Sequence, residues 1–431
     1  MKKNLFTIIA VLVFVILLTG ASFIFLKNKA QNNTTNNSKK FSNLNIKNEN
    51  LNNNNLGYSD DYGDNYNEET DQQRNNPTLE DTVKKSKLQQ ITTVPIAGFN
   101  IVKDSDLGRN LIYYIRAGTG NVFYSDPNNN NFDNKLSNTT VKNTYGGTIS
   151  NNGKYVAIQA KQNSTRELLI GKISTTTKSI NFTLVAKGVT QVYAISDNDF
   201  VYTVKGNNGF MVRYYYPVSG TSETLVNVPF REAAVNFSNI KNIKDNYYIY
   251  TKASKYLDGV VYEVSNIDYK KRLPFSGQGL SAVGNKRFVI YSKFDNKDNF
   301  YKSFIYDSKT KRVSDLNFSV LPEKCITIKN ELVCATSLNQ NSANLPDSWY
   351  KGLESFSDKI ISIGYENGVV IKNLLSPYEI TGQKLDITNL TTDEDNRYLL
   401  FMDKKRNVLW QYNLGNEFTA SPREERKIDD N

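Results

Sequence analysis

The residues able to carry out acid–base or metal chemistry are few in this sequence of 431 residues, which contains no histidine and only two cysteines. Without histidine there is no Ser-His-Asp or Cys-His arrangement, and the commonest ligand of transition metals is missing. Two cysteines joined to each other would leave no thiolate for a zinc or iron–sulfur site. We therefore expect no catalytic residue of these classes, no bound metal and no cofactor.

Paired carboxylates, as glycosidases use them, are the one catalytic chemistry that this composition permits. Five acidic residues lie near the ends of predicted strands: Asp126, Asp197, Asp245, Asp307 and Glu366. Aspartate is also an ordinary turn former, and this explains each position without catalysis. The sequence favours a non-catalytic protein and leaves a hydrolytic, glycosidase-like enzyme as the alternative.

The two cysteines enclose an alternating apolar segment centred on Lys329 and Asn330. A two-residue hairpin turn there places Cys325 directly opposite Cys334. Counting outward from the turn makes this a non-hydrogen-bonded pair, whose Cα atoms approach to about 4.5 Å, within reach of a disulfide. The pattern predicts a disulfide and hence an oxidising compartment, and the alternative is a pair of buried free thiols in a cytosolic chain.

One of only two tryptophans lies in a polar segment without strand alternation, from Leu345 to Gly352. Aromatic residues in loops are often binding anchors. Asp347, Trp349, Tyr350 and Lys351 therefore form a possible binding loop. The alternative is that Trp349 tucks under the loop and caps the end of its repeat.

The N-terminus predicts a membrane anchor. Residues 5–26 carry no charge and are apolar or small, which is long enough for a helix to cross a hydrocarbon core of about 30 Å. The alternative is a cleaved secretory signal at Thr19-Gly20-Ala21, although the apolar run continues beyond it. Basic residues are nearly balanced on the two flanks, so the expected orientation, with residues 1–4 in the cytoplasm, rests on the predicted disulfide.

Composition divides the rest of the chain into three parts. Residues 27–95 are rich in asparagine and cannot bury enough apolar surface to order themselves, which predicts a disordered stalk. Residues 416–431 are charged and predict a disordered tail. Residues 96–415 form the predicted folded domain, held outside the cytoplasm by a single membrane pass.

Seven short β-rich segments recur within that domain. They are Leu111–Arg116, Tyr155–Ala160, Phe200–Val204, Tyr247–Thr251, Phe288–Ser292, Leu332–Thr336 and Tyr398–Met402. Their spacing is close to 44 residues throughout if residues 337–358 are an insertion. A period of about 44 residues without helical patterning is typical of a β-propeller with one four-stranded blade per repeat. We expect an all-β, seven-bladed propeller, and a strand at Ile96–Lys103 is one way to close its circle.

Two segments carry a family resemblance. Residues 150–158 (SNNGKYVAI) and 392–401 (TDEDNRYLLF) resemble the S-P-D-G-K-Y-hydrophobic repeat of WD40-like, TolB-type propellers. Asn151-Asn152 replaces the family's Pro-Asp, and the later copy lacks the glycine. The layout of the whole chain is similar to uncharacterised membrane-anchored propeller proteins of small-genome bacteria. The resemblance implies the fold and brings no assigned activity.

The net charge of +10 makes the chain basic. Such an excess favours anionic wall polymers, anionic lipid head groups or nucleic acid, and the alternative is that it only maintains solubility. No Lys/Arg run in the domain exceeds three residues, so we do not expect nucleic acid as a partner. The sequence thus predicts a propeller that binds an envelope protein or a polysaccharide.

Overall fold

The computed structural model describes residues 87–104, 108–126, 131–206, 209–237, 245–265, 269–337, 344–365 and 368–418. These residues belong to the second of two compact units, which spans Thr82–Asn431. The predicted membrane segment at residues 5–26, its flank at residues 1–4 and most of the predicted stalk and tail lie outside the described residues. Among the described residues, no helix is both long enough and apolar enough to span a membrane.

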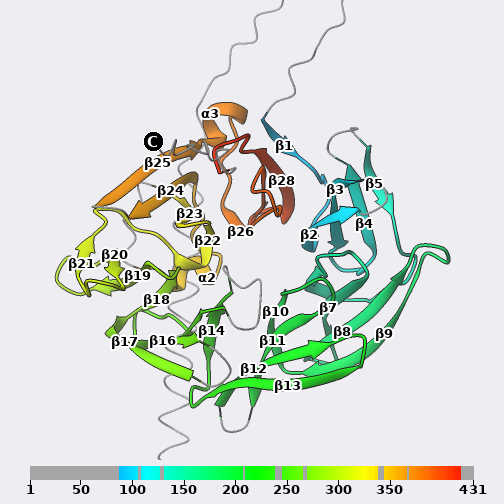
Figure 1. The fold of residues 1–431 in the computed structure, drawn as a ribbon, viewed down its shortest axis with the longest axis horizontal. Coiled ribbons are helices and arrows are strands. Elements are labelled where there is room, and N and C mark those ends of the chain that lie inside the picture. The colour runs from blue at the N-terminus through cyan, green and yellow to red at the C-terminus, as the bar shows by residue number, and fades with distance from the viewer. Residues whose placement is uncertain are drawn as a thin grey trace, which may run out of the picture. The chain divides into compact units, whose positions relative to one another are not determined.

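The described strands form seven antiparallel sheets of four strands each, arranged around a common axis (Figure 1). Blade 1 contains β2 (Ile96–Asp104), β3 (Arg109–Arg116), β4 (Val122–Asp126) and β5 (Asn131–Lys135). Blade 2 contains β6 (Thr144–Ile149), β7 (Tyr155–Gln162), β8 (Thr165–Ser174) and β9 (Ser179–Lys187). Blade 3 contains β10 (Val189–Ala194), β11 (Phe200–Gly206), β12 (Gly209–Tyr216) and β13 (Thr221–Val228).

The second half of the ring repeats this order. Blade 4 contains β14 (Ala233–Asn236), β15 (Tyr247–Thr251), β16 (Asp258–Ser265) and β17 (Tyr269–Gln278). Blade 5 contains β18 (Ser281–Gly284), β19 (Phe288–Asp295), β20 (Phe300–Asp307) and β21 (Val313–Asp315). Blade 6 contains β22 (Cys325–Ile328), β23 (Glu331–Thr336), β24 (Lys359–Tyr365) and β25 (Val369–Leu375). The structure is an all-β, seven-bladed propeller.

Blade 7 joins the two ends of the domain. Its strands β26 (Ile387–Thr392), β27 (Tyr398–Asp403) and β28 (Val408–Asn413) come from the C-terminal end, and β1 (Leu88–Gln90) pairs with β28 as the outermost strand. The strand that closes the ring is therefore β1 and not Ile96–Lys103, which forms most of the inner strand of blade 1. The folded domain also begins before the expected boundary at residue 96.

All seven segments that the sequence analysis singled out lie within the second strand of a blade, namely β3, β7, β11, β15, β19, β23 and β27. These strands are buried along most of their length, as in β27, where only Tyr398 is not fully buried. A strand covered on both faces has a continuous apolar sequence, and this made the second strands recognisable. The predicted repeat is confirmed.

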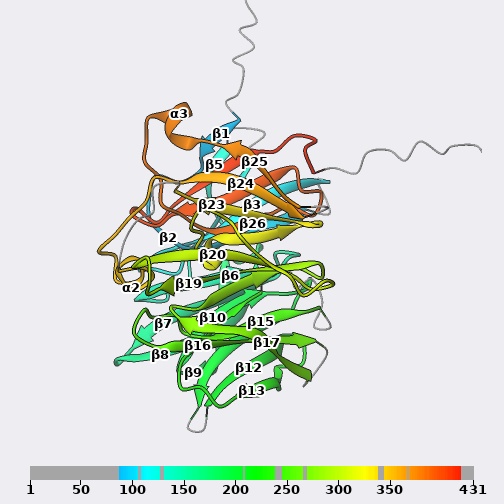
Figure 2. The same ribbon diagram turned by 90° about the vertical axis from the view of Figure 1, so that its left-hand side faces the viewer.

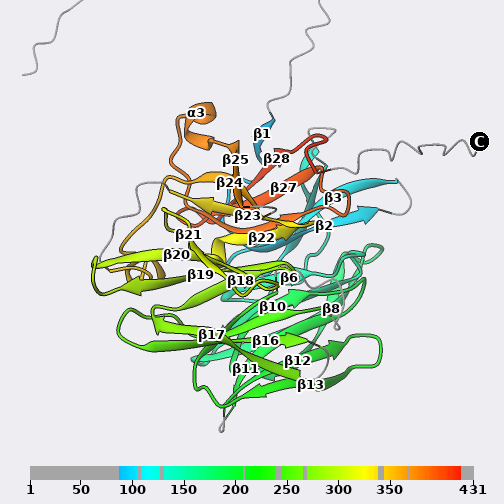
Figure 3. The same cartoon turned by 60° about the vertical axis from the view of Figure 1, so that its left-hand side comes forward.

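The core consists of apolar clusters between neighbouring blades. In one of them, Phe288 and Ile305 of blade 5 pack with Leu332 and Ile363 of blade 6. The described residues also include three short helices: η1 (Pro322–Lys324) precedes β22, α2 (Asp347–Tyr350) lies between β23 and β24, and α3 (Pro377–Thr381) follows β25. Helix α3 lies beside β25 (Figure 3). It is at the same end of blade 6 as α2 (Figure 2), because β23 and β25 both end where β24 begins.

Candidate functional site

The predicted disulfide is present. Cys325 on β22 is paired directly with Cys334 on β23, their Cα atoms are 4.1 Å apart, and the two sulfur atoms are bonded. Both cysteines are buried against blade 5. Cys325 also borders the central cavity described below, so the disulfide fixes the wall of that cavity at blade 6.

We expect a thiol assay of the denatured, non-reduced protein to detect no free thiol, because both cysteines of the sequence are bonded. The same sample treated with a reductant should yield two thiols per chain, which serves as the control. Two reactive thiols before reduction would contradict the disulfide and the argument for an oxidising compartment.

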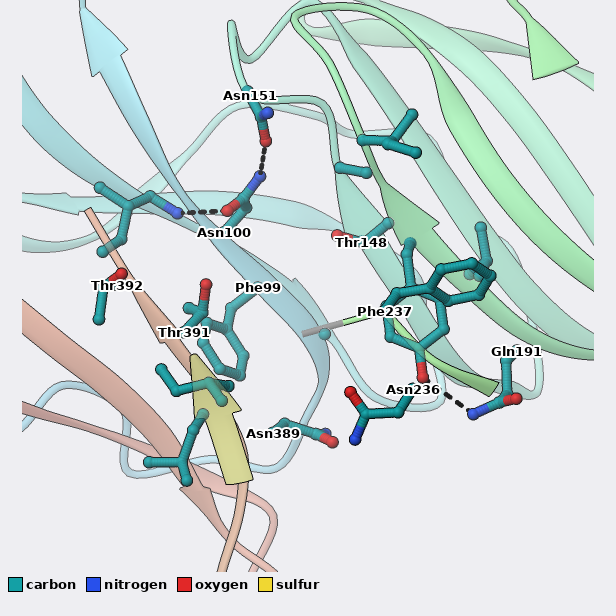
Figure 4. A pocket seen from close by; sticks show the side chains of 18 of the residues that line it. Phe99, Asn100, Thr148, Asn151, Gln191, Asn236, Phe237, Asn389, Thr391 and Thr392 are labelled. Atoms are coloured by element: carbon teal, nitrogen blue, oxygen red, sulfur yellow. Dashed lines mark hydrogen bonds between the residues drawn. The ribbon is translucent and has the colours of Figure 1, made fainter. Parts of the chain in front are cut away.

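A cavity of about 1580 Å³ lies at the centre of the ring. It is lined by inner strands β2, β6, β10, β14, β22 and β26, together with the loops at their ends. Because six of the seven blades contribute their innermost strand to this lining, residues far apart in sequence meet around one space. Figure 4 shows this wall, with Phe99 of blade 1 and Phe237 next to blade 4 on different sides. We refer to this cavity as the channel.

Amide side chains are the most prominent polar groups of the channel wall (Figure 4). The Nδ2 atom of Asn100 donates hydrogen bonds to the carbonyl oxygen of Ile149, at 2.7 Å, and to Oδ1 of Asn151, at 3.0 Å. Gln191 of blade 3 accepts from the backbone N–H of Val235 in blade 4, at 3.1 Å. These bonds join neighbouring blades and orient amide groups that can both donate and accept.

The charged groups of the channel are mainly acidic. Its wall includes five carboxylates and two lysines: Asp197, Asp245, Glu323, Asp393, Glu394, Lys103 and Lys329. This excess of negative charge contrasts with the net charge of +10 of the chain. The expectation that basic character favours anionic partners therefore does not extend to the channel.

Glu323 was not anticipated from the sequence. It lies in η1, one turn before β22, and Tyr350 of α2 donates a hydrogen bond to its Oε1 atom. Burial raises the pKa of Glu323, and the hydroxyl groups of Tyr250 and Tyr350 form hydrogen bonds that oppose this shift. A carboxyl group thus sits in an aromatic part of the channel wall, where water stabilises its charge poorly.

The loop from Asp347 to Lys351 packs against the ring. Trp349 is only 6% exposed and lies in one buried cluster with Tyr301, so it is not an exposed binding anchor. Asp347 accepts a hydrogen bond from the backbone N–H of Lys255 at 2.7 Å, and Lys351 is exposed. The alternative prediction, in which the tryptophan tucks under its loop, describes the structure.

A fully buried ion cluster fixes this loop. The Nζ atom of Lys324 lies 2.5 Å from Oδ2 of Asp358 and 2.9 Å from Oδ1 of Asp386, and all three side chains are buried. The indole N–H of Trp349 donates to both oxygens of Asp386 at 3.1 Å. The cluster thereby joins η1, the end of the inserted loop and the start of blade 7. None of the three ionic residues lines the channel.

Four of the five carboxylates considered for catalysis are described, and they do not all border one cavity. Asp126 forms an ion pair with Arg109 at 2.7 Å on blade 1, and Asp307 accepts backbone N–H groups of the turn after β20. Asp197 and Asp245 border the channel on blades 3 and 4, and Glu366 lies outside the described residues. The described His, Cys, Asp and Glu residues form no group that could hold a metal ion.

No protein-family model and no curated protein matches the sequence. Among solved structures, the chain is similar to the β-propeller domain of the Trilobed protease from Pyrococcus furiosus, with 11% identity and a TM-score of 0.44 over 79% of this chain and 100% of that domain. A putative TolB from Agrobacterium tumefaciens has 13% identity and a TM-score of 0.35, over 53% of this chain and 86% of that one.

An acylaminoacyl peptidase from Pyrococcus horikoshii has 9% identity and a TM-score of 0.43, over 74% of this chain. The match spans only about half, 52%, of the peptidase chain. Identities this low carry no information about activity.

Proposed function

We propose that this protein is a non-catalytic binding module whose channel takes up an extended segment of a partner protein. The observation that carries the proposal is the channel itself, a space of about 1580 Å³ with amide and aromatic groups on several inner strands. Amide side chains complement a polypeptide, because each peptide group also offers one donor and one acceptor. The negative charge of the wall disfavours anionic polymers as channel ligands.

We further propose that the module is anchored in a membrane and works outside the cytoplasm, where its partner is an envelope protein. The apolar segment at residues 5–26 supports the anchor. The Cys325–Cys334 disulfide supports an oxidising compartment.

Narrowing the channel tests the proposal. Thr148 of β6 lines the channel, and its replacement by tyrosine adds an aromatic ring to the wall. We expect the anchored wild-type protein, crosslinked in its own membrane, to capture a defined partner protein, and the Thr148→Tyr variant to lose that partner. The matched control is Thr176→Tyr, an identical change at an exposed position in the turn between β8 and β9.

The control should retain the wild-type partner. Equal capture by both variants, or capture of a polysaccharide instead of a protein, would refute the proposed function. The hydrolytic alternative receives little support from the described carboxylates, because Asp126 and Asp307 are held by Arg109 and by turn N–H groups away from the channel.

A further inference from the structure

The channel wall around Glu323 combines one carboxyl group with several aromatic side chains. Glu323, Tyr193, Tyr250 and Phe237 all border the channel. The rings of Tyr193 and Phe237 pack edge to face, with centroids 4.8 Å apart. Tyr350 reaches the same carboxyl group from the inserted loop. The carboxyl group is therefore held in a fixed position with aromatic neighbours.

The described cations of this region do not neutralise that carboxyl group. Lys324 is its neighbour in sequence, but the ammonium group of Lys324 is bound by Asp358 and Asp386. Lys103 and Lys329, the two lysines of the channel wall, lie at or just after the C-terminal ends of β2 and β22, whereas Glu323 precedes β22. Strand β22 separates Glu323 from Lys329 by roughly 13 Å, at about 3.3 Å per residue.

The pKa values of the neighbouring tyrosines also indicate that the carboxyl group of Glu323 lies in a poorly hydrated environment. Burial raises the pKa of Tyr193 to about 12, and the charge of Glu323 contributes to this shift. Burial also raises the pKa of Tyr250, again with a contribution from Glu323. The carboxyl group and the aromatic hydroxyls therefore share one poorly hydrated environment, in which an added positive charge would have a large effect.

We propose that this part of the channel binds a primary ammonium group, supplied by a lysine side chain of the partner segment. The inference rests on the proposed function and names the residue type that the channel recognises. An ammonium group offers three donors to the carboxylate and to tyrosine oxygens, and aromatic faces attract cations. The acidic excess of the channel further favours a cationic segment over a neutral one.

The test uses two short peptides with blocked ends, Gly-Gly-Lys-Gly-Gly and its counterpart with norleucine in place of lysine. Norleucine keeps the whole aliphatic chain of lysine and removes the ammonium group. We expect calorimetry to show that the wild-type protein binds the lysine peptide about tenfold or more tightly, as for a charge-assisted hydrogen bond. Glu323→Gln should remove this preference and leave both peptides equally weak.

Glu379→Gln is the matched control, because Glu379 is an exposed carboxylate of α3 that pairs with Lys359 at 3.0 Å and does not line the channel. This variant should keep the preference for lysine. Glu323→Gln should also unfold at the same or a higher denaturant concentration than wild type at neutral pH, because burial disfavours the charged form that it removes.

Three results would overturn the inference. The first is that wild-type protein does not bind the lysine peptide at millimolar concentration, and the second is that Glu323→Gln keeps the preference for lysine. The third is that the protein binds glucosamine, an amino sugar with an ammonium group, but not the lysine peptide. The proposed function fails separately, through equal partner capture by Thr148→Tyr and Thr176→Tyr. If Thr148→Tyr loses the partner but Glu323→Gln keeps the preference for lysine, the lysine site is refuted and the proposed function is not.

Discussion

Replacing Lys324 by methionine is expected to lower the free energy of unfolding by about 3–5 kcal/mol at neutral pH. Lys324 is fully buried and supplies the positive charge shared by Asp358 and Asp386. Methionine fills a similar volume but leaves two buried carboxyl groups without a counter-charge. Equilibrium unfolding in guanidinium chloride, followed by tryptophan fluorescence, measures the loss.

Lys271→Met is the matched control, since Lys271 is exposed on β17. It should change the free energy of unfolding by no more than about 0.5 kcal/mol. Adding Asp358→Asn and Asp386→Asn to Lys324→Met should restore part of the lost stability, because the unpaired charges are then removed. A loss below about 1 kcal/mol in the single variant would contradict a dry, closed ion cluster.

The contribution of Asp358 to stability is expected to decrease as the pH rises from about 4 to about 6.5. Burial raises the pKa of Asp358 from 3.8 to about 6, although Lys324 opposes the shift. Between these values the folded protein holds a proton that the unfolded chain has released, so stability falls with rising pH. The decrease is at most about 3 kcal/mol, at 1.36 kcal/mol per unit of pKa.

The measurement is the free energy of unfolding of wild type and of Asp358→Asn across this pH range. The free energy of unfolding of Asp358→Asn should increase relative to that of wild type as the pH rises, because asparagine does not titrate. Asp307→Asn is a control of opposite sign: burial raises the pKa of Asp307, but hydrogen bonds from Thr310 and Lys309 outweigh it and lower the pKa. Asp307 should stabilise the protein above its unfolded pKa and lose this effect at lower pH. A difference between wild type and Asp358→Asn that does not change with pH would refute the assignment.

The strands that could be predicted are those whose environment leaves a pattern in the sequence. The second strand of each blade is covered on both faces, and this requires a continuous apolar segment such as Phe200–Val204. The repeat of these segments gave the blade count. Outer strands lack such a constraint: β21 is three residues long, and none of its residues is fully buried.

Strand β1 was missed for a similar reason. Its sequence, Leu-Gln-Gln, is too short for any alternation, and its partner β28 lies more than 300 residues away. Only Leu88 is buried among its three residues, so the register with β28 depends on tertiary packing. A pattern search could not identify a strand whose pairing is determined by the closure of the ring.

In the candidate site, too, only the contacts between residues close in sequence could be predicted. Cys325 and Cys334 could be paired from the sequence because one short hairpin determines their register. The contacts of Lys324 with Asp358 and Asp386 span 34 and 62 residues, and no local rule predicts them. The aromatic surroundings of Glu323 come from blades 3 and 4 and the inserted loop, so the sequence carried no signal of this site.

The closure by β1 has a mechanical consequence. The chain passes through β1 before it enters blade 1. A force applied to the chain on the N-terminal side of β1 therefore acts first on the three residues that pair with β28. Peeling β1 away would remove the strand pairing between the two ends of the circle and leave blade 7 with three strands, packed against blade 1. Stretching the chain from that side would therefore loosen the ring at one seam while the other six blades keep all their strands.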